Sequence, residues 1–381
     1  MLGTAAGLEI TPPQRAIGMS TVRLCLTITA ALLTIMPASA QSVSYEMVPV
    51  GDPGNINDTI NTGTNPNYGA VPYAYQIGKY EVTIGQYAAF LNAVAKTDTY
   101  LLYAMEMATD RSIAGVVRSG SSGSYTYSVT GPSGTAPAGA NSPGNRPILY
   151  VSWFDSARFA NWMSNGQPTG LQGPTTTENG AYDLSNWSSG TAPAMNVTNP
   201  NTGSTPLYRI PTENEWYKAA YYKGGGTTSG YWSYATQSNT TPGNTIGGGS
   251  NQANWFAGTH AVTQSSIYFM NQNYLTNVGA FTNSQSPYGT FDQSGNVLEW
   301  NDLTGTAGSS RGLRGGTFGN NGTASLLILS SGGRITQNPA IGFYGFRLAS
   351  PIPIPEPPTY AMALAGLACG GFSLFRRRKR A

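Results

Sequence analysis

The two cysteines of this 381-residue chain both lie outside the region that could form its folded interior. Cys25 lies in an apolar run near the start and Cys369 in an apolar run near the end, so residues 26–368 contain no cysteine. A chain of this kind cannot stabilise its central region with disulfides or bind a metal there through thiolates. Its stability must come from packing, from hydrogen bonds within loops, or from bound ions.

The first forty residues are typical of an export signal. Met19 is a plausible start, because Arg23 then precedes the apolar run Leu24–Met36. That run is too short to span a bilayer, and Ala38–Ala40 supplies a small-x-small cleavage pattern. We therefore predict a signal peptide over 1–40, with a short buried helix as the alternative.

The last residues, 351–381, have three parts. Residues 351–359 read "PIPIPEPPT", which is stiff and extended because each proline fixes its own backbone and restricts its predecessor. Residues 360–375 are uncharged and apolar but short for a membrane-spanning helix, and residues 376–380 are all basic. Basic residues after an apolar helix hold that end in the cytoplasm.

This order of parts resembles the PEP-CTERM sorting signal of Gram-negative bacteria. The motif residues are Pro355, Glu356 and Pro357, followed by the arginines Arg376, Arg377 and Arg378. The resemblance implies a membrane sorting protease as a partner, and delivery to the cell surface or extracellular matrix after transient anchoring by residues 360–375. A plain C-terminal membrane anchor is the alternative.

The charge of the central region excludes one class of partner. Without the two ends, 13 of the 20 basic and 15 of the 17 acidic residues remain, which gives a net charge of −2. Nucleic-acid binding requires clustered Lys and Arg, and this region has no such cluster. We therefore expect no nucleic-acid partner.

The residue pattern predicts an α+β fold of low regular content with long loops. Helices are expected after Thr83, after Trp153, and from Thr212, where Thr212 and Glu215 form a capping box and Gly224 ends the helix. Strands are expected over 44–51, 73–83 and 146–153. Long surface loops rich in Gly, Ser, Thr, Asn and Pro are expected over 119–145, 165–206 and 224–250.

Six blocks in one order give the chain a family resemblance. They are "KYEVT" (79–83), "VSW" (151–153), "RIPTENEW" (209–216), "GNVLEW" (295–300), "LRGGTF" (313–318) and "GFR" (345–347). This order resembles the formylglycine-generating enzyme, or sulfatase-modifying factor, family over residues 43–350. The resemblance implies a complex C-type-lectin-like α+β fold.

The resemblance fails at the catalytic positions. Enzymes of the family bind copper(I) through two cysteines after the Gly-Gly block and oxidise a substrate cysteine to formylglycine. By register those positions hold Asn320 and Ser325 here, and neither replaces a soft thiolate ligand. Copper is therefore not expected. An iron-dependent branch of the family is excluded as well, because His260 is the single histidine of the chain.

A structural calcium site is the cofactor that the resemblance implies. The matching residues are Asp292 and Glu299 through their side chains and Gly295 and Val297 through their carbonyl oxygens, a ligand mixture that suits Ca²⁺. The alternative is that Asp292 and Glu299 bond to nearby backbone groups and order a turn. A weaker second site would use Asn254 and Trp255.

Other singled-out residues are expected to be structural. Glu81 and Arg347 are expected to form a buried pair, and Arg314 is expected to hold the last strands together. Glu213 and Glu215 do not share a helix face, so we do not interpret them as an acid/base pair. His260 is expected to be a surface or packing residue.

The sequence thus predicts an exported cell-surface or matrix protein with a non-catalytic formylglycine-generating-enzyme-like domain that binds carbohydrate or peptide in an exopolysaccharide context. One alternative is an oxidoreductase that converts a protein cysteine to formylglycine with atypical metal ligands. Another is a purely structural biofilm component.

Overall fold

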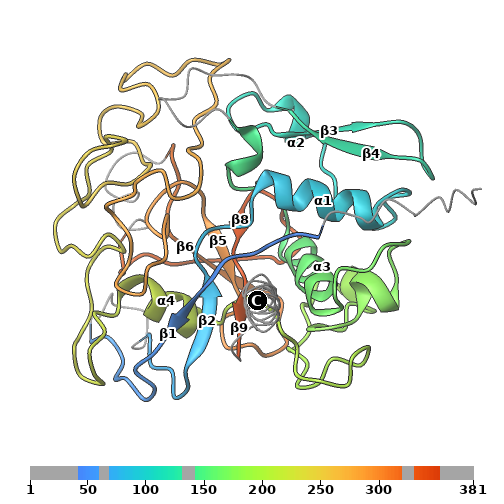
Figure 1. The fold of residues 1–381 in the computed structure, drawn as a ribbon, viewed down its shortest axis with the longest axis horizontal. Coiled ribbons are helices and arrows are strands. Elements are labelled where there is room, and N and C mark those ends of the chain that lie inside the picture. The colour runs from blue at the N-terminus through green and yellow to red at the C-terminus, as the bar shows by residue number, and fades with distance from the viewer. Residues whose placement is uncertain (1–41, 60–67, 131–141, 320–329, 352–381) are drawn as a thin grey trace, which may run out of the picture. The chain divides into compact units, whose positions relative to one another are not determined.

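The computed structural model describes residues 42–59, 68–130, 142–319 and 330–351 (Figure 1). The predicted signal peptide, Asn320, Ser325 and the sorting motif with its apolar run and arginines lie outside these residues. Among the described residues, no helix is long and apolar enough to cross a membrane.

One small sheet joins the beginning and the end of the domain. Its strands are β1 (Met47–Val50), β2 (Tyr75–Gly78) and β9 (Ala349–Ser350), in the order β1-β2-β9 and antiparallel throughout. The β1 and β2 strands fall inside the predicted ranges 44–51 and 73–83. Because β2 pairs with β9, this sheet brings the N-terminal and C-terminal segments of the domain together.

A second sheet carries the residues of the functional region. It contains β7 (Ile335–Gln337), β6 (Arg311–Arg314), β5 (Glu299–Asn301) and β8 (Gly345–Phe346), in that order. β5 pairs with β6 antiparallel and with β8 parallel. A separate hairpin is formed by β3 (Val116–Ser119) and β4 (Thr126–Val129).

Three of the helices begin with a capping box, as their sequences allow. α1 (Ile84–Val94) is capped by Thr83, α3 (Trp153–Ser164) by Ser152, and α4 (Glu213–Tyr221) by Thr212. A short helix α2 (Glu106–Thr109) and the turns η1 (Pro143–Asn145), η2 (Pro174–Glu178) and η3 (Trp187–Ser189) complete the regular elements of the described residues. The mixed content with few regular residues confirms the predicted α+β class.

Aromatic side chains form the centre of the largest hydrophobic core. Phe90 of α1 packs against Phe159 and Trp162 of α3, with ring centroids 5.3 and 5.2 Å apart. Phe159 also meets Phe346 of β8 at 5.5 Å. These contacts fix α1 and α3 on the second sheet, and each such aromatic pair adds about 0.5–1.5 kcal/mol beyond its buried area.

Three local predictions were wrong. The range 119–145, predicted to be a surface loop, contains β4, which pairs with β3. Residues 146–153 form isolated bridges, Thr83 with Pro147 and Val151 with Tyr344, instead of a strand. α4 ends at Tyr221, before Gly224, because the extended backbone of Tyr222 breaks the helix. In the last two cases a bridge to another segment overrides the local pattern: Val151 bridges to Tyr344, and Tyr222 bridges to Tyr231.

The loop 165–206 is long, as predicted, but much of it is not on the surface. Ala181, Tyr182 and Leu184 are fully buried in the main core. Glu178 accepts hydrogen bonds from the Arg158 side chain of α3 at 2.8 and 3.0 Å. The loop therefore forms part of the core, whereas residues 222–298 run as irregular backbone in the yellow and orange part of Figure 1.

Buried ion pairs cross-link the cysteine-free domain. The pairs are Arg158–Glu178, Arg209–Glu215, Arg311–Asp302, Arg314–Glu213 and Arg347–Glu299. Glu215 also caps α4, as predicted, so its carboxylate serves both the helix and Arg209. Arg314 joins β6 to Glu213 of α4 and to the carbonyl oxygens of Ser331 and Gly333, which precede β7, so its partners lie in a helix and a loop and not in the last strands.

Candidate functional site

The segment 292–299 leads into β5 through a tight turn. Asp292, Gly295 and Asn296 have φ values of 62°, 95° and 59°. The Gly295 backbone N–H donates to the Gly315 carbonyl at 2.6 Å, and the Asn296 N–H donates to the Asn254 carbonyl at 2.8 Å. A Cβ at position 295 would lie 2.4 Å from the Asn254 carbonyl oxygen, so the turn requires glycine there.

The two segments that were predicted to bind calcium are therefore neighbours. The Asn254 side chain donates to the Tyr274 carbonyl at 2.9 Å and to Asn296 Oδ1 at 3.0 Å. The Trp255 carbonyl accepts a hydrogen bond from Asn244 Nδ2 at 3.2 Å. Both residues of the weaker site thus bond to other protein groups, and Asn254 bonds to the turn itself.

Glu299 is bonded to a cation of the protein itself. Its Oε2 accepts from Arg347 Nε at 2.6 Å and from Trp216 Nε1 at 2.8 Å, and its Oε1 accepts from Arg347 Nη2 at 2.6 Å. Arg347 also donates to the carbonyl oxygens of Gly78 and Phe291. The expected pair of Arg347 with Glu81 is thus replaced by a bidentate pair with Glu299.

Glu81 and Asp292 are two further carboxyl groups beside this pair. Both are buried, and Asp292 Oδ2 accepts from the Gly279 N–H at 2.6 Å. Burial raises the pKa of Asp292 to about 6. Burial, and next the charge of Asp292, raise the pKa of Glu81 well above its usual value. If all three carboxylates were ionised, their charge would exceed that of Arg347 by two.

Glu299 is not available as a calcium ligand in this arrangement. Both oxygens of Glu299 are bonded to Arg347, and the described residues contain no cluster of three or more His, Cys, Asp or Glu side chains that could hold a metal ion. Asp292 is the predicted carboxylate ligand that is not ion-paired. Calcium binding stays a prediction from the sequence.

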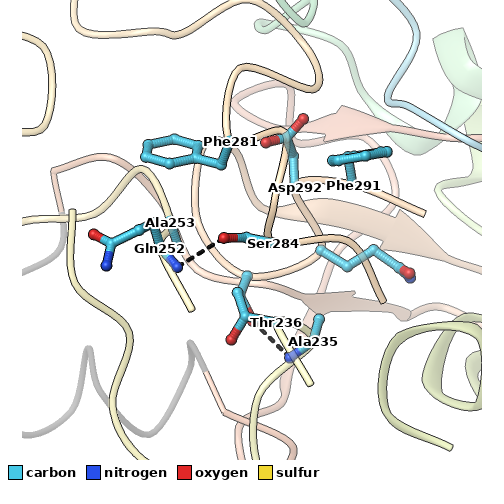
Figure 2. Close-up of a pocket in the computed structure, with 10 residues that line it drawn as sticks. Ala235, Thr236, Gln252, Ala253, Phe281, Ser284, Phe291 and Asp292 are labelled. Carbon is cyan, nitrogen blue, oxygen red and sulfur yellow. Dashed lines mark hydrogen bonds between the residues drawn. The ribbon is translucent and has the colours of Figure 1, made fainter. Parts of the chain in front are cut away.

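The pocket on the Asp292 side is small and mostly polar. Figure 2 shows Asp292 between Phe281 and Phe291, and the Ser284 hydroxyl accepting a hydrogen bond from the Gln252 N–H at 2.9 Å. The pocket has a volume of about 10 Å³, which is enough for a single water-sized group. This pocket cannot hold an organic substrate.

The order of blocks agrees with a comparison across known families. Residues 36–352 match the sulfatase-modifying factor enzyme 1-like domain. The chain belongs to this family. No curated protein matches it closely enough to count as a relative.

Three solved structures resemble the sulfatase-modifying-factor domain of this chain. Treponema denticola variable protein 1 is 18% identical with a TM-score of 0.43, over 83% of this chain and 100% of its own. CarF is 20% identical with a TM-score of 0.42, over 81% and 99%. PvdO from Pseudomonas aeruginosa is 17% identical with a TM-score of 0.41, over 80% and 94%. Similarity at this level supports no inference about function.

The Gly-Gly block of the sulfatase-modifying-factor domain is attached to the turn described above. Gly315 and Gly316 have φ values of 105° and 81°, and Gly315 receives the hydrogen bond from Gly295. The Phe318 N–H donates to the Asn296 carbonyl at 3.0 Å. Asn320 and Ser325, which the sequence resemblance predicts to occupy the family's cysteine positions, come next in the chain and lie outside the described residues.

A stack of aromatic rings lies beside this block, and the sequence analysis missed it. Phe318 stacks on Tyr274 at 5.9 Å with 4° between the planes, and Tyr274 stacks on Tyr268 at 4.8 Å with 15°. His260 packs on Tyr274 at 4.5 Å and on Phe256 at 4.7 Å. His260 is buried and serves as a packing residue, and burial lowers its pKa.

Tyr268 forms part of an open cleft of about 480 Å³. The cleft is lined by Thr109, Asp110, Arg111, Tyr268, Met270 and Asn271. The run 267–270, "IYFM", is exposed at every position, which is unusual for consecutive apolar residues. That run, within an Asn-rich stretch, is the sequence signal that could have indicated this surface.

Proposed function

We propose that the chain is an exported cell-surface or matrix protein whose sulfatase-modifying-factor domain binds a carbohydrate or peptide and makes no formylglycine. The observation that carries this proposal is the absence of cysteine from residues 26–368. Copper(I) needs soft thiolate ligands, and asparagine and serine are poor substitutes for them. The family's oxygen-dependent chemistry therefore has no ligands in this domain.

The proposed location follows from the two ends of the sequence. The apolar run before Ala38–Ala40 supports export, and the Pro355–Pro357 motif with its apolar run and arginines supports handling by a membrane sorting protease. A domain that functions outside the cytoplasm without disulfides needs other cross-links. The buried ion pairs described above provide them.

Binding is supported by the surface near the Gly-Gly block. Aromatic rings that are fixed by stacking lose little entropy when a ligand covers them, and amide and charged groups around them can bond to hydroxyl or peptide groups. Tyr268 and Met270 are exposed within a cleft large enough for a small ligand. His260 is buried in the aromatic stack and is therefore not available to activate a nucleophile at this surface.

The experiment that tests this proposal is a conversion assay. The purified protein is supplied with copper(I) and oxygen and incubated with a peptide that carries a Cys-x-Pro-x-Arg motif, and mass spectrometry monitors conversion of the cysteine to an aldehyde. We expect no conversion above a control without protein. Conversion by folded protein would refute the proposal and support an oxidoreductase with atypical metal ligands.

A further inference from the structure

The proposed binding function can be assigned to a particular surface, and the inference that follows rests on that function. The surface is the cleft between the segment 109–111, at the end of α2, and the segment 268–271. It lies beside the aromatic stack of Tyr268, Tyr274 and Phe318. We call it the Tyr268 cleft.

The ring of Tyr268 is held in its orientation by stacking on Tyr274. One side of the ring lies on Tyr274, which in turn lies on Phe318, so the three rings are nearly parallel. The Tyr274 hydroxyl accepts a hydrogen bond from the Phe269 N–H at 2.6 Å, which ties the stack to the exposed run 267–270. Half of Tyr268 remains exposed, and it lines the cleft. A pre-oriented aromatic face of this kind favours a ligand that is itself flat and partly apolar.

The polar groups of the cleft are also held in place. Asp110 accepts hydrogen bonds from Tyr150 and Ser112, both at 2.5 Å, which fixes its carboxylate. Arg111 donates from Nη1 to Asn271 Oδ1 at 2.6 Å. A guanidinium has five N–H donors and an amide has two, so this bond leaves Arg111 and Asn271 with further donors for a ligand.

The charge and backbone of the cleft narrow the class of ligand. Its charged side chains are one aspartate and one arginine, so their charges cancel and a neutral ligand is favoured. The lining residues form no strand, so the cleft has no sheet edge to which an extended peptide could add. A ring face flanked by carboxylate, guanidinium and amide groups matches a sugar, which has one apolar face and a rim of hydroxyl groups.

We propose that the Tyr268 cleft binds a neutral saccharide, with one pyranose ring on the exposed face of Tyr268 and its hydroxyl groups bonded to Asp110, Arg111 and Asn271. The volume of about 480 Å³ lies within the range of small-ligand sites. No covalent step takes place. The site uses stacking for affinity and the three polar side chains for orientation.

The test uses affinity electrophoresis of the full chain through gels that contain dextran, galactomannan, xylan or laminarin. Three variants are compared with the natural protein. Tyr268→Ala removes the platform, Tyr268→Phe keeps the ring, and Leu171→Ala changes an exposed apolar residue that lies outside the cleft. Melting temperatures of all variants establish that each one is folded.

We expect at least one polysaccharide to retard the natural protein. Tyr268→Ala should weaken that binding by roughly tenfold, equivalent to about 1.4 kcal/mol. Leu171→Ala should bind within about twofold of the natural protein, because it lies outside the cleft. Tyr268→Phe, which keeps the ring face, should lose less binding than Tyr268→Ala.

Two results would overturn the proposal while leaving the proposed function standing. Retardation that is unchanged in folded Tyr268→Ala would place saccharide binding elsewhere on the protein. Retardation by none of the four polysaccharides, together with binding to an immobilised peptide array, would assign the domain to peptides instead. Failure of the proposed function itself has a different readout, namely aldehyde formation in the conversion assay.

Discussion

Replacing Glu299 by glutamine removes the negative partner of Arg347 at a fully buried position. Both side chains have no solvent exposure, and they share two hydrogen bonds of 2.6 Å. Glutamine keeps the size of the side chain and can still accept from Trp216. The substitution therefore tests the charge of the pair with little change in packing.

The expected loss of stability follows from the cost of leaving a buried guanidinium without its partner. Breaking a buried ion pair costs about 3–5 kcal/mol. Asp292, with a pKa of about 6, stays mostly ionised at neutral pH and offsets part of the Arg347 charge, so we expect the lower end, about 3 kcal/mol. For a domain of this size that is a fall in melting temperature of roughly 6 °C.

Thermal unfolding of the natural protein and of Glu299→Gln, followed by tryptophan fluorescence at neutral pH, measures this difference. Glu46→Gln is the matched control, because Glu46 pairs with Lys79 at 2.8 Å but its side chain is 58% exposed. Such a surface pair contributes at most about 1 kcal/mol.

Equal shifts for the two variants would refute the reasoning. A second check uses Arg347→Met as the background. If the loss caused by Glu299→Gln is unchanged in that background, it does not come from the ion pair.

Three further predictions concern the residues around the site. Burial lowers the pKa of His260, so the folded state favours the neutral imidazole. This contribution to the stability of the fold is complete above the usual pKa of 6.5 and is lost as the pH falls below it. Melting curves between about pH 7 and 5 should show a steeper fall for the natural protein than for His260→Gln, and parallel curves would contradict this. Gly295→Ala should lower the free energy of unfolding by about 1–3 kcal/mol more than Gly166→Ala. Both glycines have positive φ, but only a Cβ at position 295 would meet a backbone oxygen, that of Asn254, at 2.4 Å. Urea unfolding measures both variants, and equal losses of stability would show that the turn can open. A calcium ion near Asp292 would offset the excess negative charge around Arg347, so millimolar Ca²⁺ should raise the melting temperature of chelator-treated protein. Asp292→Asn should remove that rise. No rise in the natural protein would refute the calcium prediction.

Features that depend on a few adjacent residues could be predicted from the sequence. The Thr212–Glu215 box predicted the start of α4, and Thr83 predicted the start of α1. Each cap is satisfied by atoms within three residues, so no distant segment can change it. The order of family blocks also predicted the fold class.

Features that depend on distant segments could not be predicted in the same way. Arg347 has Glu81 and Glu299 within reach, and the alignment of β5 beside β8 decides in favour of Glu299. The aromatic stack combines residues near 268 with Phe318, which are joined only in the folded chain. The spacing of residues in the sequence carries no information about such long-range contacts.

The order β1-β2-β9 has a consequence for how the domain matures. β2 is made early, yet its second neighbour, Ala349–Ser350, is the last strand of the domain. During synthesis, the edge of β2 that pairs with β9 therefore stays unpaired until residue 350 has left the ribosome. Pairing across that sequence distance is slow, because a loop of nearly the whole domain must close first. Such a chain would be exposed to proteases and to self-association throughout its synthesis, so a holding chaperone should affect its yield more strongly than it affects the stability of the finished fold.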